Sequence, residues 1–341
     1  MDGEGGRTVG TPQADDGAFE LPAVLARLDA DDRDEQRAAV AAVRDTLADD
    51  PAVCLPTVPK LRRLLGDADV DFYGEVAYCL AELATESTAD VAPSTDEIVA
   101  FAVENPERPA TAELLRCLAT IAADQPSAVV DHADAIAGVI DRRPGYDRRG
   151  LKIFQQLSAA QPGAIQSAVP VLTAALEDDP ERHGVAVLSA VGRLARSETP
   201  LPTLEFVDPA LELVDHDAVP LRRNAVGCLA DVARRTPTAV EPAVPELATA
   251  LEHDDGETRA NAAVAIARVT AELTSVLEPV REPLLERLDD DHDRVRANAA
   301  VALGYGRVDA ATDRLSTLAH EDPNPDVRER ASWALDQVSS A

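Results

Sequence analysis

The sequence predicts an all-α fold in which one pair of short helices is repeated along the chain. Residues 244–271 read as two helices joined by an acidic turn at 253–256. About 37 residues later, residues 283–304 repeat the pattern, and both copies carry Arg-Ala-Asn-Ala-Ala, at 259–263 and 296–300. An identical five-residue match in register, with matched apolar spacing, is typical of a repeat array.

The repeat can be followed along the chain on one large apolar residue in each second helix. Further apolar residues lie three and four positions before it and three positions after it, which is the stripe of one buried helical face. Nine repeats result, at spacings between 32 and 39 residues, on Val43, Leu80, Leu118, Leu157, Val191, Leu229, Ile266, Leu303 and Leu335.

Each first helix is expected to start near a proline, and the turns between the two helices are acidic. Proline is tolerated in the first turn of a helix because its missing N–H would have no partner there. Acidic residues before a second helix can cap it and meet its positive end, contributing about 0.5–1 kcal/mol each. The prolines are Pro56, Pro59, Pro170, Pro209, Pro242, Pro245, Pro279 and Pro283, and the acidic turns include 67–69, 177–179, 215–217, 254–255 and 289–291.

The ends and the composition of the chain indicate one soluble array. Residues 1–18 are rich in Gly and Asp without periodicity, and we predict a disordered acidic tail there, followed by a single domain at 19–341. No apolar run approaches the roughly 18 residues that a membrane span needs. The N-terminus lacks the basic and apolar regions of a secretion signal. We therefore expect no membrane partner and a cytoplasmic location.

The charge balance is strongly acidic. The formal net charge is −30, from 62 acidic and 32 basic residues, and only Lys60 and Lys152 are lysines. This acidic surface, with arginine preferred to lysine, resembles that of proteins from salt-loving archaea, where the charge keeps a protein soluble and the Debye length is about 3 Å at 1 M salt. It counts against nucleic acid as a partner, since phosphates need clustered Lys or Arg.

At the level of motifs, the chain resembles the HEAT repeat in its short, phycobilisome-lyase-like form. The resemblance rests on a first helix led by proline, an acidic turn and the pattern Val-Arg-x-x-Ala-x-x-Ala-Leu, clearest at 295–304 and 327–335. It covers roughly residues 20 to 341 and implies a right-handed α-solenoid of about nine helix pairs, with the second helices on the concave side. In the first five repeats Gln36, Tyr73, Thr111, Gly150 and Gly184 stand in place of the arginine.

Two sets of residues recur at one position of the later repeats. Arg222, Arg259, Arg296 and Arg328 follow the acidic turn, and we predict a structural ladder in which each binds acids or carbonyls of its neighbour. Asn224, Asn261 and Asn298 lie two residues further on. In the related armadillo arrays an asparagine ladder holds the main chain of an extended peptide, so these are candidate partner-binding residues. We favour the alternative that each amide bonds its own neighbouring helix.

A basic stretch at residues 141–152 is the third candidate. It contains Arg142, Arg143, Arg148, Arg149 and Lys152 around Tyr146, in a loop longer than its counterparts. Arginine and tyrosine are enriched at binding hot spots, which suggests a partner-binding surface. Pairing of these cations with the acidic turns of adjacent repeats is an equally open interpretation.

The sequence offers no constellation for chemistry. The motifs GxSxG, HExxH, GxxxxGK[ST] and GxGxxG are absent, and the four cysteines have no metal spacing. Deoxyhypusine hydroxylase resembles these repeats and holds two irons with His-Glu pairs at the start of second helices, but the matching positions here contain none. We expect no catalytic residue, cofactor, metal or small-molecule substrate.

The predicted function is a non-enzymatic scaffold that binds a protein or extended peptide on its concave face. The alternative is an enzyme or chaperone-like factor related to HEAT-type lyases.

Overall fold

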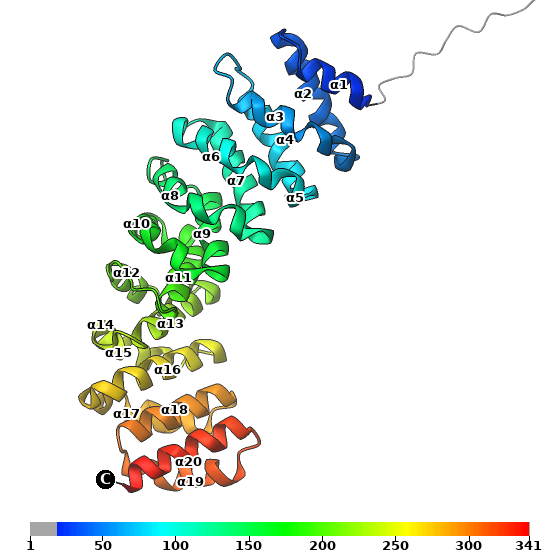
Figure 1. Cartoon of the computed structure of the whole chain (residues 1–341). Coiled ribbons are helices and arrows are strands. Elements are labelled where there is room, and N and C mark those ends of the chain that lie inside the picture. Colours follow the sequence, from blue (N-terminus) through cyan, green and yellow to red (C-terminus); the bar gives the residue numbers. More distant parts are fainter. Residues whose placement is uncertain (1–18, 341) are drawn as a thin grey trace, which may run out of the picture.

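The computed structural model describes residues 19–340, and these form a curved stack of nine helix pairs without a strand (Figure 1). The predicted tail at 1–18 lies outside the described residues. The pairs are α1 (Leu21–Leu28) with α2 (Arg33–Leu47), α3 (Val58–Leu65) with α4 (Tyr73–Glu86), α6 (Thr95–Glu104) with α7 (Pro109–Asp124), α8 (Ala133–Asp141) with α9 (Arg148–Ala160), α10 (Val169–Asp178) with α11 (Pro180–Arg196), α12 (Val207–Leu211) with α13 (Val219–Ala233), α15 (Val244–Ala250) with α16 (Gly256–Glu272), α17 (Arg281–Glu286) with α18 (Asp293–Tyr305), and α19 (Thr312–Glu321) with α20 (Pro325–Ser339). The predicted all-α solenoid is confirmed.

Short helical turns connect one pair to the next. They allow the chain to reverse direction within a few residues, and several of them lead directly into a first helix. The one-turn α-helices are α5 (Thr88–Val91) and α14 (Pro237–Val240), and the 3-10 turns are η1 (Pro51–Thr57), η2 (Ala92–Ser94), η3 (Pro126–Ala128), η4 (Val130–His132), η5 (Pro162–Ala168), η6 (Glu241–Ala243), η7 (Thr274–Val280) and η9 (Asp309–Ala311). A further 3-10 turn, η8 (Arg287–Asp289), lies inside the eighth pair, between α17 and α18.

The second helices line the inside of the curve. Consecutive second helices pack tightly on each other along the whole array, whereas consecutive first helices have far fewer close approaches. Packing that is tighter on one side of a stack bends the stack toward that side. Figure 1 shows this arrangement, with α6, α8, α10 and α12 on the outer side and α7, α9, α11 and α13 on the inner side.

The core is a continuous apolar seam between the two layers of helices. The residues on which the nine repeats align are buried from Val43 to Leu303. Leu335, in the ninth repeat, is only partly buried, because among residues 19–340 α20 has a neighbouring second helix, α18, on one side only. Each repeat therefore buries its apolar side mainly against its neighbours, as a solenoid requires.

Candidate functional site

One position at the start of the second helices closes the preceding turn. In seven of the nine repeats its side chain donates a hydrogen bond to the carbonyl six residues earlier, over 2.5 to 2.8 Å. The donors are Gln36, Tyr73, Thr111, Arg222, Arg259, Arg296 and Arg328. The four predicted arginines thus share a geometric task with three residues of different chemistry. We call this the turn-closing position.

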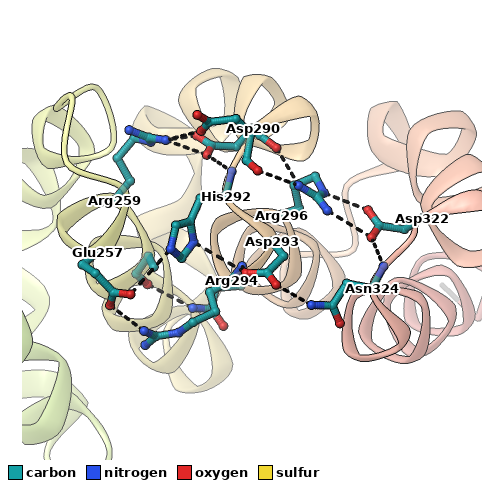
Figure 2. A network of polar contacts seen from close by, with 12 residues as sticks. Glu257, Arg259, Asp290, His292, Asp293, Arg294, Arg296, Asp322 and Asn324 are labelled. Carbon is teal, nitrogen blue, oxygen red and sulfur yellow. Dashed lines mark hydrogen bonds and ion pairs between the residues drawn. The ribbon is translucent and has the colours of Figure 1, made fainter.

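Two of the four arginines also reach the next repeat. Arg259 donates from Nε and Nη2 to the two carboxylate oxygens of Asp290, over 2.8 and 2.7 Å. Arg296 binds Asp322 in the same two-point manner, over 2.7 and 3.0 Å (Figure 2). Both aspartates lie in the turn of the following repeat, so each pair connects neighbouring repeats through a charge-assisted bond.

The other two arginines lack this carboxylate for different reasons. The residue that corresponds to Asp290 in the repeat after Arg222 is His253, and among the described residues the buried Nε of Arg222 has no hydrogen-bond partner. Arg328 belongs to the ninth pair, the last in the described part of the chain, and its guanidinium donates to the Asp322 and Pro323 carbonyls of its own turn. These contacts support the structural role that we propose for the arginine ladder.

Burial and hydrogen bonding act in opposite directions on the aspartates of the ladder. Burial by itself would raise the pKa of Asp290, but hydrogen bonds from Arg259 and from the His292 N–H outweigh it and lower that pKa. The same balance, with Arg296 as the donor, lowers the pKa of Asp322. Both carboxylates are therefore charged when the arginines bind them.

The turn-closing position carries no donor side chain in the fourth and fifth repeats. Gly150 and Gly184 occupy it, and a Cβ there would lie 2.6 Å from Ile140 Cδ1 or 2.4 Å from Leu221 Cδ1. Apolar side chains thus fill the space that a donor side chain needs. The two repeats are joined instead by the buried imidazole of His183, whose Nε2 lies 3.1 Å from the carbonyl oxygen of Gly145.

The predicted basic stretch divides into two groups around this gap. Arg142 donates to the Gly138 carbonyl of α8, whereas Arg143 donates to the Asp147 carboxylate of its own loop and to the Pro106 carbonyl of the preceding repeat. Tyr146, at φ 44°, packs partly buried in the turn between them and α9. Arg148, Arg149 and Lys152 line a hollow between α9 and α11, which we call the basic hollow, together with Asp147, Gln155, Arg182, Val185 and Ala186.

Basic residues are segregated to the inner layer in the middle of the array. The first helices α6, α8, α10, α12 and α15 contain no Arg or Lys. Their partners α7, α9, α11, α13 and α16 contain eleven, which are Arg116, Arg148, Arg149, Lys152, Arg182, Arg193, Arg196, Arg222, Arg223, Arg259 and Arg268. In a chain with a net charge of −30, the second helices of the middle repeats are thus rich in cations, although Arg222 and Arg259 are buried at their turn-closing positions.

Two of these arginines lie beside one carboxylate on the inner surface, and a third, Arg193, lines the same surface. Arg196 binds Asp231 through two hydrogen bonds of 3.1 and 2.7 Å, and Arg268 Nη1 lies 3.8 Å from the same carboxylate. Arg193 donates to the Gln155 carbonyl over 3.0 Å. Burial lowers the pKa of Arg193 and of Arg268, because it disfavours the charged form. The cluster holds more positive than negative charge in partly desolvated surroundings.

Two shallow grooves extend this surface along the second helices. The first lies over α11, α13 and α16, and we call it the central groove; it is lined by Gly192, Arg193, Arg196, Arg223, Asn224, Gly227, Asp231 and Asn261, among others. The second reaches the end of the array, and we call it the terminal groove; Arg234, Val264, Arg268, Asn298, Val301, Tyr305 and Arg330 line it. Tyr305 packs against Trp333 with ring centroids 4.8 Å apart.

The three predicted asparagines lie in these grooves but differ in their bonding. Asn224 donates to the Pro220 carbonyl of its own helix over 2.7 Å. Asn298 is buried, donates to the Ala260 carbonyl over 3.0 Å and accepts from Arg330 over 2.7 Å. Asn261 is half-buried and lines the central groove. The amides of Asn224 and Asn298 would have to break these bonds to hold a peptide.

Sequence reasoning missed the arginines at the centre of the surface. Arg193 and Arg268 both lie nine residues after the turn-closing position of their repeats, at Gly184 and Arg259. Asp231 lies nine residues after Arg222, at the same place in the repeat between them. Aligning this second position across the repeats would have revealed the cluster.

Comparison with known proteins agrees with a helical-repeat solenoid. A family model described as HEAT repeats matches residues 281–341, the last two repeats. No curated protein matches the chain. The chain is similar to a solved engineered protein, with 18% identity, a TM-score of 0.76 and coverage of 93% of this chain and 88% of that one. It is also similar to a structure from work on "a conserved phosphorylation switch" that controls the interaction between cadherin and beta-catenin. That match has 17% identity, a TM-score of 0.73 and coverage of 94% and 76%. At such identities the likeness shows the fold alone.

No helix among the described residues is long and apolar enough to cross a membrane.

Proposed function

We propose that the protein is a non-enzymatic scaffold that binds an extended, acidic segment of a partner protein along its concave face. The observation that carries this proposal is the segregation of cations to the inner helices in the middle repeats of an acidic chain. A partner with negative charge is attracted to the inner surface and repelled by the outer one. We propose that the predicted single domain, 19–341, acts as one continuous scaffold.

The shape and chemistry of the two grooves support an extended ligand. They follow successive second helices, so a chain lying in them would contact several repeats at once. Arginines offer two-point bonds to carboxylates, and the Tyr305–Trp333 pair offers an aromatic contact at one end. The beta-catenin structure is described by its interaction with cadherin, which is a protein partner on a fold of this kind.

The alternative function is an enzyme or chaperone-like factor related to HEAT-type lyases. It would need His, Glu or Asp side chains converging on a pocket, and the described residues contain no group of three or more metal-binding side chains. The concave arginines favour the scaffold over this alternative. The lyase-like subtype, an origin in a salt-loving archaeon and a cytoplasmic location remain part of the proposal, and the acidic outer helices support the second of these.

The proposal can be tested with a fluorescent peptide of about 20 residues rich in Asp and Glu. We expect saturable binding by anisotropy, weakened by the charge reversal Arg234→Glu/Arg330→Glu in the terminal groove. The matched control Arg281→Glu/Arg314→Glu reverses two cations on first helices, outside both grooves, and should bind as the parent chain does. Equal loss in both variants, or equally tight binding of single-stranded DNA, would refute the proposal.

A further inference from the structure

The basic hollow stands apart from the two grooves and is formed by the first turns of α9 and α11. It occurs at the two repeats whose turn-closing position is glycine. Four cations line it, Arg148, Arg149, Lys152 and Arg182, and its volume is about 500 Å³. A hollow of this size admits a small ligand together with its water.

The carboxylates next to these cations are already engaged. Asp147 accepts from Arg143 over 3.2 Å and from the Arg149 backbone N–H over 2.9 Å. Arg149 lies 3.4 Å from Glu113, but Glu113 also accepts from Arg116 over 2.8 Å. The side chain of Arg149 thus has one acidic neighbour, Glu113, which it shares with Arg116.

The other three cations have no acidic partner. Within residues 19–340, no carboxylate lies within ion-pair distance of Arg148, Lys152 or Arg182. This is unusual in a chain with 62 acidic residues, where other repeats supply an aspartate to a neighbouring arginine. The three residues are exposed, so an anion can reach their side chains without displacing an ion pair.

The helix ends themselves are not the source of this site. Asp147 already caps α9, and Asp179 caps α11 by accepting from the Arg182 backbone N–H over 3.0 Å. Recognition must therefore come from the side chains. Guanidinium groups bind tetrahedral oxyanions through two parallel N–H bonds, and an ammonium group adds a compact charge.

We propose that the basic hollow binds a phosphate monoester or inorganic phosphate. The lining holds four cations and one carboxylate, Asp147, and a dianion balances more of the remaining positive charge than a single carboxylate does. Its several acceptor oxygens suit the donors of Arg148, Lys152 and Arg182. Val185 and Ala186 form an apolar wall beside these donors. The site does not depend on the acidic ligand proposed for the grooves, since it shares no lining residue with them.

The first test is calorimetric titration of the full chain with inorganic phosphate at pH 7.5, in chloride buffer of constant ionic strength. We expect one saturable site, and Arg148→Gln, Lys152→Gln or Arg182→Gln should each weaken it roughly tenfold or more. Arg142→Gln is the matched control, because Arg142 lies in the same loop but donates to the Gly138 carbonyl outside the hollow. It should leave the affinity unchanged.

A second arm identifies the source of the phosphate. A Gly-Ser peptide with one phosphoserine is compared with free phosphate and with the same peptide unphosphorylated. Tighter binding of the phosphopeptide assigns the site to a phosphorylated protein, and equal binding assigns it to the free ion. The proposal is overturned if phosphate gives no saturable heat while circular dichroism shows a folded chain. It is also overturned if Arg142→Gln weakens binding as much as the hollow variants do.

Discussion

The guanidinium of Arg259 binds the carboxylate of Asp290 across the boundary between the seventh and eighth repeats, with N–O distances of 2.7 and 2.8 Å. The remaining Nη1 of Arg259 donates to the His253 carbonyl of its own turn over 2.8 Å. One side chain thus closes a turn and sets the position of the next repeat. In a solenoid, whose stability is a sum of repeats and interfaces, such a bond acts on the interface.

The first prediction separates these two tasks of the arginine. Arg259→Ala should lower the free energy of unfolding by about 3–4 kcal/mol, because it removes the two-point partner of the buried Asp290 carboxylate and leaves Arg287 Nη1, 3.4 Å away, as the remaining ion-pair partner. Arg222→Ala removes a turn-closing arginine that binds no carboxylate, and should cost about 1–3 kcal/mol. Urea unfolding of both variants measures the difference, and equal losses would show that the carboxylate contributes nothing.

The second prediction concerns acid. The pKa of Asp290 is lowered from its ordinary value of 3.8, so on acidification the unfolded chain takes up this proton before the folded chain does. The stability from the pair is present above about pH 3.8 and is lost as the pH falls through the lower, folded pKa. Urea unfolding at pH 2.5 to 6 should show this loss. Asp290→Asn should be less stable at pH 6 and flatter with pH, whereas a parallel curve would contradict the assignment.

A third prediction applies to His183, between the fourth and fifth repeats. Burial lowers its pKa from the ordinary value of 6.5, with Arg182 adding to the effect, while the bond to Gly145 and the charges of Asp179 and Asp178 oppose it. Its contribution to stability is therefore complete above about pH 6.5 and decreases as the pH falls toward the folded pKa. Stability measured between pH 7.5 and 5.5 should decrease for the parent chain more than for His183→Gln. The same slope in both proteins would exclude this histidine as the cause.

The fourth prediction tests the glycine at the turn-closing position of the fifth repeat. Gly184→Ala places a Cβ 2.4 Å from Leu221 Cδ1, and the overpacking should cost about 1–3 kcal/mol. Gly138→Ala is the control, since Gly138 lies in α8 with no heavy atom within 4 Å of an added Cβ. That change should stabilise the helix by about 0.5–1 kcal/mol. Thermal melts of both variants should shift in opposite directions, and a gain for Gly184→Ala would mean that the site can accommodate the methyl group.

The fold could be predicted because the same pattern of apolar residues recurs in each repeat. Agreement between distant copies, such as 259–263 and 296–300, compensates for the weakness of any one match. The turn-closing arginines were also found by alignment. Alignment did not reveal that Gln36, Tyr73 and Thr111 have the same role. Unrelated side chains can donate a hydrogen bond to a carbonyl six residues earlier.

The candidate surface was harder to predict, because it depends on which long side chains turn toward one another. Arg142 and Arg148 are close neighbours in the sequence, yet the first binds the backbone of α8 and the second lines the basic hollow. Arg182 joins the hollow from the next repeat. Proximity of charges along the chain therefore identified only half of that site.

The separation of charge between the inner and outer helices gives the molecule an electrical polarity across its curve. The field of such a body acts over about a Debye length, before any side chains touch. A negatively charged chain that diffuses close to the protein is therefore attracted to the concave face and repelled by the convex face. The salt concentration should therefore change the rate of association more than the rate of dissociation.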